Sequence, residues 1–600
     1  MTTDLHSMSN TSQPVFIGDR TMWLTWAVGF FLIASILGLI MRLFHIWDVP
    51  VLDYRNILHA HSHLALLGWG YTALLVGIVF SLNFQPKSQI ALKWLFGASV
   101  FANLGMLVSF PIQGYGPISI GFSTLHVLIT YGFAWIILPV LSQNRQKTGV
   151  RMIRMAMVFQ LLSTLGLWAL GPIISSLGRM HELYFMSIQW FLHFQLNGWF
   201  VLGVLGLLIL HFEQKRVTLP LTRFKLGFAA LTVVLTYALA VTWAEPSPWA
   251  FRVNSLAVVL QLIAYSWIFR LLLPCKNQLV GISRLLLGLA LASLVAKALL
   301  QALLVIPAVA VMSYTIRMYV IGFLHLVLLG VMTLGLSAFA LAKGWLPVSR
   351  LSLTGWYLLL AGFVLTELLL FVQGTMIWAQ QGFIPDYHLW LFLASILIPV
   401  SLGIHFYSLL REKSTSEYPL NPIHTHSNRI KIHTMKKSLL WSAGILGILL
   451  TACGGGTDQS ATSTDASSEP VATEAAAPDP KGIGEIKSVD LGTGVDAALA
   501  ETGKAIVDMK CTACHQLNDK RLVGPGFQGI TNRRRPEWIL NMITNVDVML
   551  EQDPTAQKLL EECLTRMPNQ NITQADARGI LEFMRKNDEE KAGERDAASK

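Results

Sequence analysis

Charged residues are scarce in this chain, which overrides the expectation of several soluble domains that its length alone gives. Only 13% of the 600 residues are Asp, Glu, Lys or Arg, whereas 53% are hydrophobic, with 18 Trp and 30 Phe. This composition is typical of a polytopic membrane protein. Cysteine is also rare. Cys453, Cys511 and Cys514 lie in two short sequence motifs, so no disulfide framework is implied. The other two cysteines, Cys275 and Cys563, are expected to be small buried hydrophobes.

Acidic residues are few in the first three quarters of the chain. Residues 1–453 hold 28 Lys+Arg and 11 Asp+Glu, giving +17, whereas residues 454–600 hold 17 and 24, giving −7. The net charge of +10 therefore combines two regions of opposite sign. We expect the basic region to form cytoplasmic loops beside lipid headgroups, and we expect no nucleic-acid partner.

Long apolar runs predict an all-α protein with a twelve-helix membrane domain over residues 1–410. A bilayer core requires about 20 apolar residues per helix. Runs of that length lie near 22–44, 58–82, 90–110, 118–141, 152–176, 186–211, 224–243, 253–273, 282–306, 317–342, 352–373 and 387–410. Lys and Arg cluster in alternate loops, which predicts that both ends of the bundle face the cytoplasm of a bacterial cell.

A second membrane signal follows a polar cytoplasmic linker over residues 411–434. Residues 435–453 begin with Met435 and two lysines, continue with a short apolar run and end in Leu-Thr-Ala-Cys453, which is typical of a bacterial lipoprotein signal with lipidation at Cys453. The alternative is a thirteenth anchor helix that is never cut. Either way the chain leaves on the periplasmic side of the cytoplasmic (inner) membrane.

Residues 454–480 lack aromatic and basic residues and are rich in Ser, Thr, Ala, Pro and acidic residues. This composition predicts a disordered tether with a typical span of roughly 30 Å. A small domain over 481–590 and a polar tail over 591–600 follow it.

Cys511-Thr-Ala-Cys514-His515 has the spacing of a haem c attachment sequence. The two thiols form thioethers to the haem, and the histidine gives its iron an axial nitrogen. A zinc half-site would need a second ligand pair, which the sequence does not supply.

Residues 481–590 resemble a small class I cytochrome c. A helix is expected near 495–510, Leu-Val-Gly-Pro525-Gly matches the loop that supports the axial histidine, Pro536 begins another helix, and a final helix is expected over about 574–587 with Thr573 and Asp576 as its cap. The resemblance implies Met567 as the sixth ligand, with Met542, Met549 and Met509 as competitors. It also implies electron transfer without bond chemistry. Arg533, Arg534 and Arg535 would contact haem propionates or a docking partner, or form only a solvated turn.

Histidines lie within the predicted membrane helices, where they are costly and usually functional. His59, His61 and His63 begin the second helix, and His126, His193 and His325 lie in the fourth, sixth and tenth. His63, His126, His193 and His325 are expected at comparable depths, about 10 Å from the outer ends of their helices. This placement predicts a bound haem b or a metal such as copper, with unligated packing histidines as the alternative.

Twelve helices with histidines on the second, sixth and tenth resemble the haem–copper oxidase subunit I superfamily and divergent haem- and copper-containing proteins linked to nitric oxide response. The resemblance implies that His63 and His325 hold one haem b. The superfamily's histidine pair on the seventh helix is missing, and the tenth helix has one histidine instead of two. We therefore expect no oxygen-reducing oxidase activity.

Two charged residues, Lys297 and Glu367, lie within the ninth and eleventh helices. They predict either a mutual ion pair or parts of a proton path.

These features together predict an electron carrier of a bacterial respiratory chain. Its partners would be membrane lipids and a periplasmic or membrane-bound reductase or oxidase, with nitrogen-oxide reduction suiting the resemblance; quinol is a candidate donor that no motif identifies. A nitric-oxide-responsive or metal-handling membrane protein joined to an independent lipoprotein cytochrome is the alternative. A nitric oxide reductase using a non-haem metal at His193 is the third reading, and it lacks ligands on the seventh helix.

Overall fold

The structure is a computed structural model that describes residues 20–47, 49, 51–178, 181–244, 247–379, 381, 384–416, 479–512, 515–520, 524–563, 567 and 572–599. The predicted signal or anchor segment with Cys453, nearly all of the tether, and Cys514 lie outside these residues. The described part of the chain is all-α and forms no strands, as predicted.

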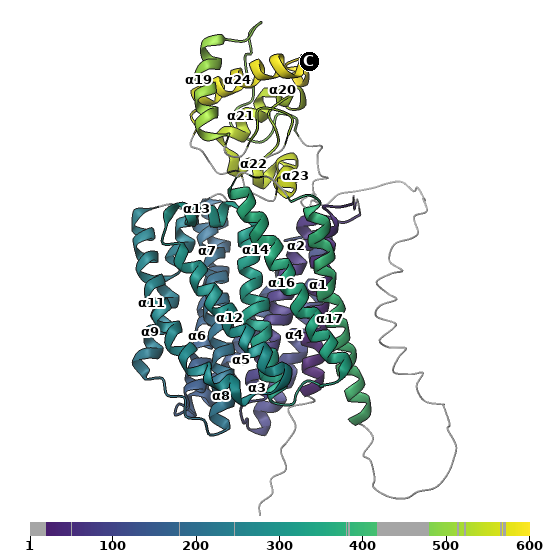
Figure 1. The fold of residues 1–600 in the computed structure, drawn as a ribbon, viewed down its shortest axis with the longest axis vertical. Helices are drawn as coiled ribbons and strands as arrows, with labels where there is room; N and C mark the ends of the chain where they lie inside the picture. Colours follow the sequence, from purple (N-terminus) through teal and green to yellow (C-terminus); the bar gives the residue numbers. More distant parts are fainter. Residues whose placement is uncertain are drawn as a thin grey trace, which may run out of the picture. The chain divides into compact units, whose positions relative to one another are not determined.

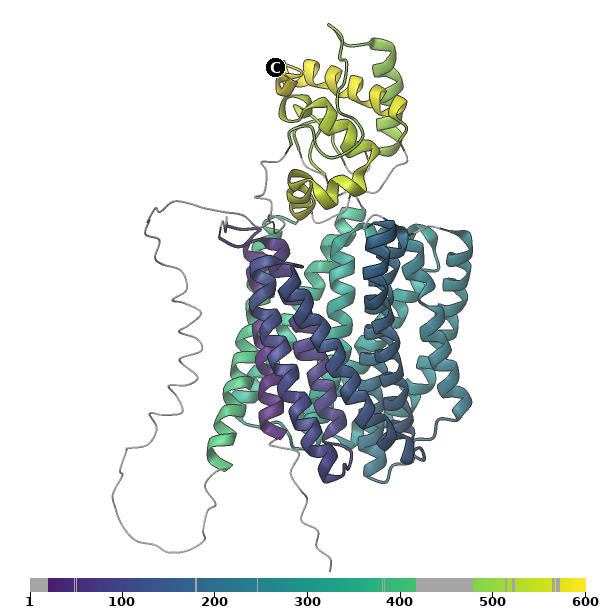
Figure 2. The ribbon, with the colours of Figure 1, turned by 180° about the vertical axis from the view of Figure 1, so that it is seen from behind.

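Twelve helices of the described residues are long and apolar enough to cross a bilayer, which confirms the prediction. Each coincides with one predicted apolar run. Their bounds are Arg20–Leu43, Tyr54–Val79, Pro86–Gln113, Pro117–Gln143, Thr148–Leu177, Glu182–Gln214, Arg223–Thr242, Pro248–Gln278, Gly281–Leu303, Arg317–Ala342, Arg350–Trp378 and Tyr387–Arg411. Figures 1 and 2 show these helices side by side in one bundle.

Six spans consist of one long helix each: α1 (Arg20–Leu43), α4 (Pro86–Gln113), α5 (Pro117–Gln143), α6 (Thr148–Leu177), α12 (Gly281–Leu303) and α16 (Arg350–Trp378). The last span lies within α17 (Tyr387–Ser416). The seventh span is α9 (Arg223–Leu235) with α10 (Ala238–Ala244), and the eighth is α11 (Pro248–Leu272) with the 3₁₀ turn η3 (Pro274–Gln278). A short helix, α13 (Pro307–Thr315), precedes the tenth span.

The second, sixth and tenth spans each contain a π-helical segment between two α-helices. They are α2 (Tyr54–His63), η1 (Leu64–Tyr71) and α3 (Thr72–Val79); α7 (Glu182–His193), η2 (Phe194–Phe200) and α8 (Val201–Gln214); and α14 (Arg317–His325), η4 (Leu326–Thr333) and α15 (Leu334–Ala342). Each π segment begins directly after a histidine, namely His63, His193 or His325. π segments are rare, and those that occur are frequently found at functional sites. Their position directly after a histidine in three spans therefore points to the histidines as the functional feature of the bundle.

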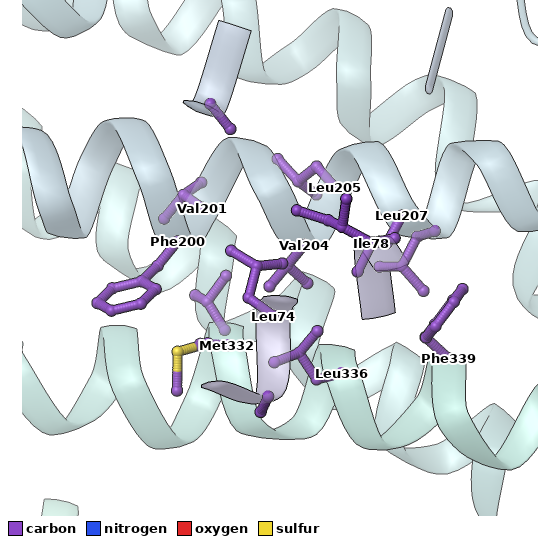
Figure 3. Packing of buried hydrophobic residues seen from close by; sticks show 14 of the residues in the cluster. Leu74, Ile78, Phe200, Val201, Val204, Leu205, Leu207, Met332, Leu336 and Phe339 are labelled. Atoms are coloured by element: carbon purple, nitrogen blue, oxygen red, sulfur yellow. The ribbon is translucent and has the colours of Figure 1, made fainter. Parts of the chain in front are cut away.

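These three spans also supply much of the bundle's core. Leu74 and Ile78 of α3, Val204 of α8 and Leu336 of α15 are buried and pack together (Figure 3). The core therefore holds the three histidine-bearing helices against one another.

The described residues of the C-terminal domain form six helices, drawn from green to yellow in Figure 1. They are α19 (Ala497–Lys510), α20 (Ile530–Arg533), α21 (Pro536–Thr544), α22 (Val546–Gln552), α23 (Pro554–Cys563) and α24 (Gln574–Ala592), followed by the 3₁₀ turn η5 (Ala597–Ser599). The predicted helices near 495–510, after Pro536 and over 574–587 are confirmed. Thr573 caps α24 as predicted, since its Oγ1 accepts the backbone N–H of Asp576 at 3.1 Å.

The first and last helices of this domain cross at two glycines. A Cβ added to Gly503 of α19 would lie 1.9 Å from the carbonyl oxygen of Gly579 in α24, so only glycine allows the two backbones to approach this closely. Because α19 is held against α24 at this crossing, the C-terminal end of α19 has a fixed position. Cys511, where the attachment sequence begins, follows directly after it.

Candidate functional site

An apolar cavity of about 180 Å³ lies inside the C-terminal domain. Side chains of the helices α20 to α24 form more than half of its walls, including Trp538 and Leu550. Cys511, His515 and Met567 also line it. The cavity therefore brings together a thiol, an imidazole and a thioether that lie up to 56 residues apart in the sequence.

His515 is held by the loop predicted to support it. Its Nδ1 lies 2.8 Å from the carbonyl oxygen of Pro525, and its ring stacks on Phe527 with ring centroids 4.7 Å apart. A Cβ on Gly524 would come within 2.3 Å of the imidazole, so this glycine makes room for the ring. Because Nδ1 donates to Pro525, Nε2 carries the lone pair that can bind iron.

Burial lowers the pKa of His515, and the hydrogen bond to the Pro525 carbonyl opposes part of that shift. The imidazole is therefore neutral near pH 7, which is the protonation state that a metal ligand requires.

The lining of the cavity distinguishes among the methionines that were predicted as possible sulfur ligands of the haem iron. Met567 and Met542 both line it. Met549 is engaged elsewhere, because its sulfur accepts the backbone N–H of Ile483 at 3.2 Å. The side chain of Met509 lies outside the described residues.

Two of the three arginines predicted beside the haem lie at this cavity, and Arg535 is not among its lining residues. Arg533 and Arg534 line it. Arg533 donates to the carbonyl oxygens of Gln528 and Gly526, and the guanidinium of Arg534 lies 5.2 Å from the centroid of the Trp538 ring. Cys563 is buried at the cavity wall, as predicted. The residues present fit a haem: an apolar slot, a thiol of the attachment sequence, an oriented imidazole and basic groups beside them.

A family model for cytochrome c matches residues 500–588. This segment is a cytochrome c domain. The chain is similar to a cytochrome c from Rhodothermus marinus at 37% identity, over 19% of this chain and 100% of that one, with a TM-score of 0.18. It is also similar to an engineered cytochrome c from Rhodothermus marinus at 36% identity, over 18% and 99%, with a TM-score of 0.18. The comparison with curated proteins gives no match.

The cytochrome c domain implies covalently bound haem c and electron transfer. When bound, haem c supplies an iron that changes oxidation state by one electron. The apolar cavity would accommodate the ring, and Cys511, His515 and Met567 are among the lining residues that would hold it.

In the membrane bundle, the Nδ1 atoms of two predicted histidines, His61 and His325, face oxygen atoms of other helices. The Nδ1 of His61 lies 2.7 Å from the carbonyl oxygen of Ala34 on α1. A Cβ on Gly38 would come within 2.9 Å of the His61 ring, so α1 leaves room for it. The Nδ1 of His325 faces the carboxylate of Glu367 at 3.9 Å.

His59 and His63 lie on another face of α2, as their four-residue spacing predicts. The Nδ1 of His63 lies 2.9 Å from the carbonyl oxygen of His59. Both rings contact Tyr115, with centroid distances of 4.4 Å for His59 and 5.6 Å for His63, and His63 also lies 4.2 Å from the Phe110 ring.

His126 and His193 make other contacts. His126 is fully buried, and its Nε2 lies 3.4 Å from the Ser99 hydroxyl. The Nε2 of His193 lies 2.7 Å from the carbonyl oxygen of Val233, and its Nδ1 lies 3.3 Å from the Asn197 amide nitrogen. Within the described residues, no three His, Cys, Asp or Glu side chains lie close enough together to hold a metal ion.

Lys297 and Glu367 have different partners. The ammonium of Lys297 donates to Oε1 of Gln301 at 2.6 Å and lies 5.3 Å from the centroid of the Tyr265 ring. Glu367 lies beside His325 instead. The structure therefore does not bring the two charged residues together as an ion pair.

The sequence did not single out several groups around these residues. Arg317 of α14 donates to the hydroxyl of Tyr54 at 3.1 Å, and Arg42 of α1 lies within electrostatic range of both His325 and Glu367. Both arginines lie at helix ends, where a sequence reads them as loop charges, so only the packing of the helices reveals their proximity to the histidines.

Proposed function

We propose that this chain is a membrane-bound electron carrier of a bacterial respiratory chain. The observation that carries the proposal is the cavity of the cytochrome c domain, which is lined by Cys511, by His515 with its Nδ1 held, and by Met567. An imidazole and a thioether together complete the coordination of a haem iron, so the site has no open position for a substrate. A thioether ligand favours the reduced iron and raises its potential, which suits a carrier near the end of a respiratory chain.

The chemistry of haem attachment also supports a location for this domain relative to the membrane. Because cytochrome c maturation takes place outside the cytoplasm, the domain belongs on the periplasmic side of the inner membrane. The alternating loop charges of the bundle and the tether after residue 453 agree with that placement. The redox partner is a reductase or oxidase of the same compartment, and a nitrogen-oxide reductase fits the resemblance of the bundle.

The bundle is proposed to hold one haem b between α2 and α14, with His61 and His325 as axial ligands. His61 lies within electrostatic range of His325, whereas His63 packs against Phe110 and Tyr115. The Nδ1 of His61 is engaged by the Ala34 carbonyl and that of His325 faces Glu367, which leaves both Nε2 atoms as the ligating nitrogens. Arg42 and Arg317 supply positive charges that suit propionates.

A reduced-minus-oxidised spectrum of membranes that contain the full-length chain tests both parts. We expect c-type bands that disappear when Cys511 and Cys514 are both replaced by alanine, together with b-type bands that remain in that variant. Membranes with c-type bands alone would remove the bundle from the electron path. Persistence of covalent haem after denaturing electrophoresis in a variant with both Cys511→Ala and Cys514→Ala would contradict attachment at this sequence.

A further inference from the structure

Glu367 is a buried carboxylate with unusual surroundings. It lies in α16, is 9% exposed, and neither carboxylate oxygen has a hydrogen-bond partner within the described part of the chain. A buried acceptor without a partner costs about 1–3 kcal/mol, and more when it is charged. Its neighbours Leu368, Leu369 and Leu370 show that α16 otherwise carries the apolar side chains that a membrane span requires. A carboxylate kept at such a cost in a membrane helix indicates a function.

The imidazole of His325 lies close to this carboxylate. Its Nδ1 lies 3.9 Å from Oε1 of Glu367 and is likewise buried without a hydrogen-bond partner among the described residues. The His325 side chain is nevertheless 28% exposed. Because Nδ1 itself is buried, the accessible part of the ring is the side away from Glu367, where Nε2 lies.

Other charged groups around Glu367 do not replace this contact. Lys297 is directed to Gln301, and Arg317 donates to Tyr54. Arg42 of α1 acts on both Glu367 and His325 electrostatically without forming an ion pair with either within the described residues. The position of His325 strengthens the case, because it ends α14 and precedes the π segment η4, and π segments occur frequently at functional sites.

We propose that Glu367 is a positioning residue for His325. Its carboxylate accepts the Nδ1–H of the imidazole, which fixes the tautomer and ring plane and makes Nε2 a more basic ligand. The gap of 3.9 Å exceeds a hydrogen bond by about 1 Å, so the proposed bond requires one of the two side chains to move toward the other. This inference rests on the proposed haem b site, for which His325 is one ligand.

The test uses full-length protein in membranes, with Glu367→Gln, Glu367→Asp and Lys297→Met compared with the unchanged chain. The readouts are the midpoint potential of the b-type bands and the ratio of b-type to c-type haem. Loss of the carboxylate makes the ligand less electron-rich and favours reduced iron. We expect Glu367→Gln to raise the reduced-to-oxidised ratio of haem b about tenfold at a fixed potential, which is about 59 mV for one electron.

The aspartate variant separates positioning from charge. It keeps the negative charge but withdraws the carboxylate from Nδ1 by one methylene, so we expect a shift in the same direction. An aspartate variant that behaves like the unchanged chain while Glu367→Gln shifts the potential would show that Glu367 acts only as a distant charge and would overturn the inference. Lys297→Met serves as the control, because it removes an equally buried charge that does not contact His325.

The outcomes also distinguish the positioning role of Glu367 from the proposed haem b site on which it depends. If the unchanged chain shows c-type bands and no b-type bands, the proposed haem b is wrong. If b-type bands are present and neither Glu367 variant moves their potential, haem b stands and the positioning role is wrong. The c-type bands report in every sample whether the chain has accumulated.

Discussion

The indole Nε1 of Trp69 donates a hydrogen bond to the hydroxyl of Thr333 at 3.0 Å. Both residues lie in π segments, Trp69 in η1 and Thr333 at the end of η4. The Thr333 hydroxyl in turn donates to the carbonyl oxygen of Leu328, five residues earlier, as the wider π turn allows. The Thr333 side chain therefore links the second span to the tenth and provides a donor for the Leu328 carbonyl oxygen of the π segment. The bond lies in the same two spans as His61 and His325.

Thr333→Val tests the importance of this link. Valine keeps the shape of threonine but leaves the Trp69 N–H buried without an acceptor, which costs about 1–3 kcal/mol. We expect a lower temperature for unfolding of the detergent-solubilised chain, followed by tryptophan fluorescence. Thr366→Val is the matched control, since the buried Thr366 hydroxyl bonds only to carbonyls of its own helix. Equal losses in the two variants would contradict a specific role for the Trp69–Thr333 bond.

Gly503→Ala is predicted to destabilise the cytochrome c domain. The new methyl group would lie 1.9 Å from the Gly579 carbonyl oxygen, so α19 and α24 must separate, at a cost of about 1–3 kcal/mol or more. Chemical denaturation followed by haem absorbance measures the change. Gly494→Ala provides the control, because nothing lies within 4 Å of the position where its Cβ would be. A Gly503→Ala variant as stable as Gly494→Ala would show that the helices do not cross as described.

The sequence predicted the spans well because hydrophobicity over about 20 residues is a strong, local signal. The tenth span agrees at both ends, Arg317 and Ala342, and the twelfth is predicted over 387–410 and observed to Arg411. The cytochrome c domain was equally readable, since Cys511 and His515 form a short motif and Thr573 a local cap. Such features depend on neighbours in sequence, so no tertiary information is needed to find them.

Features that depend on packing were missed. Nothing in Leu64–Tyr71 or Leu326–Thr333 distinguishes a π segment from an ordinary apolar helix, because the apolar run looks alike in both. The choice between His61 and His63 also requires knowledge of which face of α2 meets α1. The proximity of Glu367 to His325 could likewise not be predicted from the sequence, since the two residues lie on different spans. The short helices α22 and α23 escaped prediction because each is anchored mainly by the core of its domain.

Met567→His is predicted to lower the potential of the c-type haem. An imidazole in place of a thioether stabilises oxidised iron, and axial ligands set potentials over a range of about 0.8 V, so we expect a shift on the order of 0.1 V or more. A redox titration of the c-type bands measures it. Met542 lines the same cavity and is the competing ligand, so Met542→Leu is the control. A larger shift in Met542→Leu than in Met567→Leu would assign the sulfur ligand to Met542.

Cys453→Ser tests the predicted lipoprotein signal. If the chain is cleaved before Cys453, an antibody to the C-terminal domain detects a small membrane-bound fragment, and the serine variant, which cannot be lipidated, accumulates at the full mass of 66.5 kDa. If the segment is instead an anchor helix, both samples give the full-length band. The two results separate a released cytochrome from one continuous working chain.

Arg585→Leu is predicted to destabilise the cytochrome c domain more than the loss of a neighbouring arginine on the same helix. The Arg585 side chain is 2% exposed and donates to Glu582, which is fully buried, to Asp596 and to the carbonyl oxygens of Leu491 and Gly494. Removing it deprives the carbonyl oxygens of Leu491 and Gly494 of this donor, at about 1–3 kcal/mol for each buried acceptor, and leaves Glu582 paired with the partly exposed Arg578. Denaturant unfolding of the haem-loaded chain provides the measurement.

Arg578 provides the matched comparison, because it pairs with the same Glu582 carboxylate from a position that is 26% exposed. Its replacement by leucine leaves Arg585 to neutralise Glu582, and a partly exposed pair contributes about 1 kcal/mol or less. The predicted order of stability is therefore unchanged chain, Arg578→Leu and then Arg585→Leu. Equal losses would mean that both arginines contribute through Glu582 alone. In that case the bonds of Arg585 to Leu491, Gly494 and Asp596 would not hold the segment before α19 against α24.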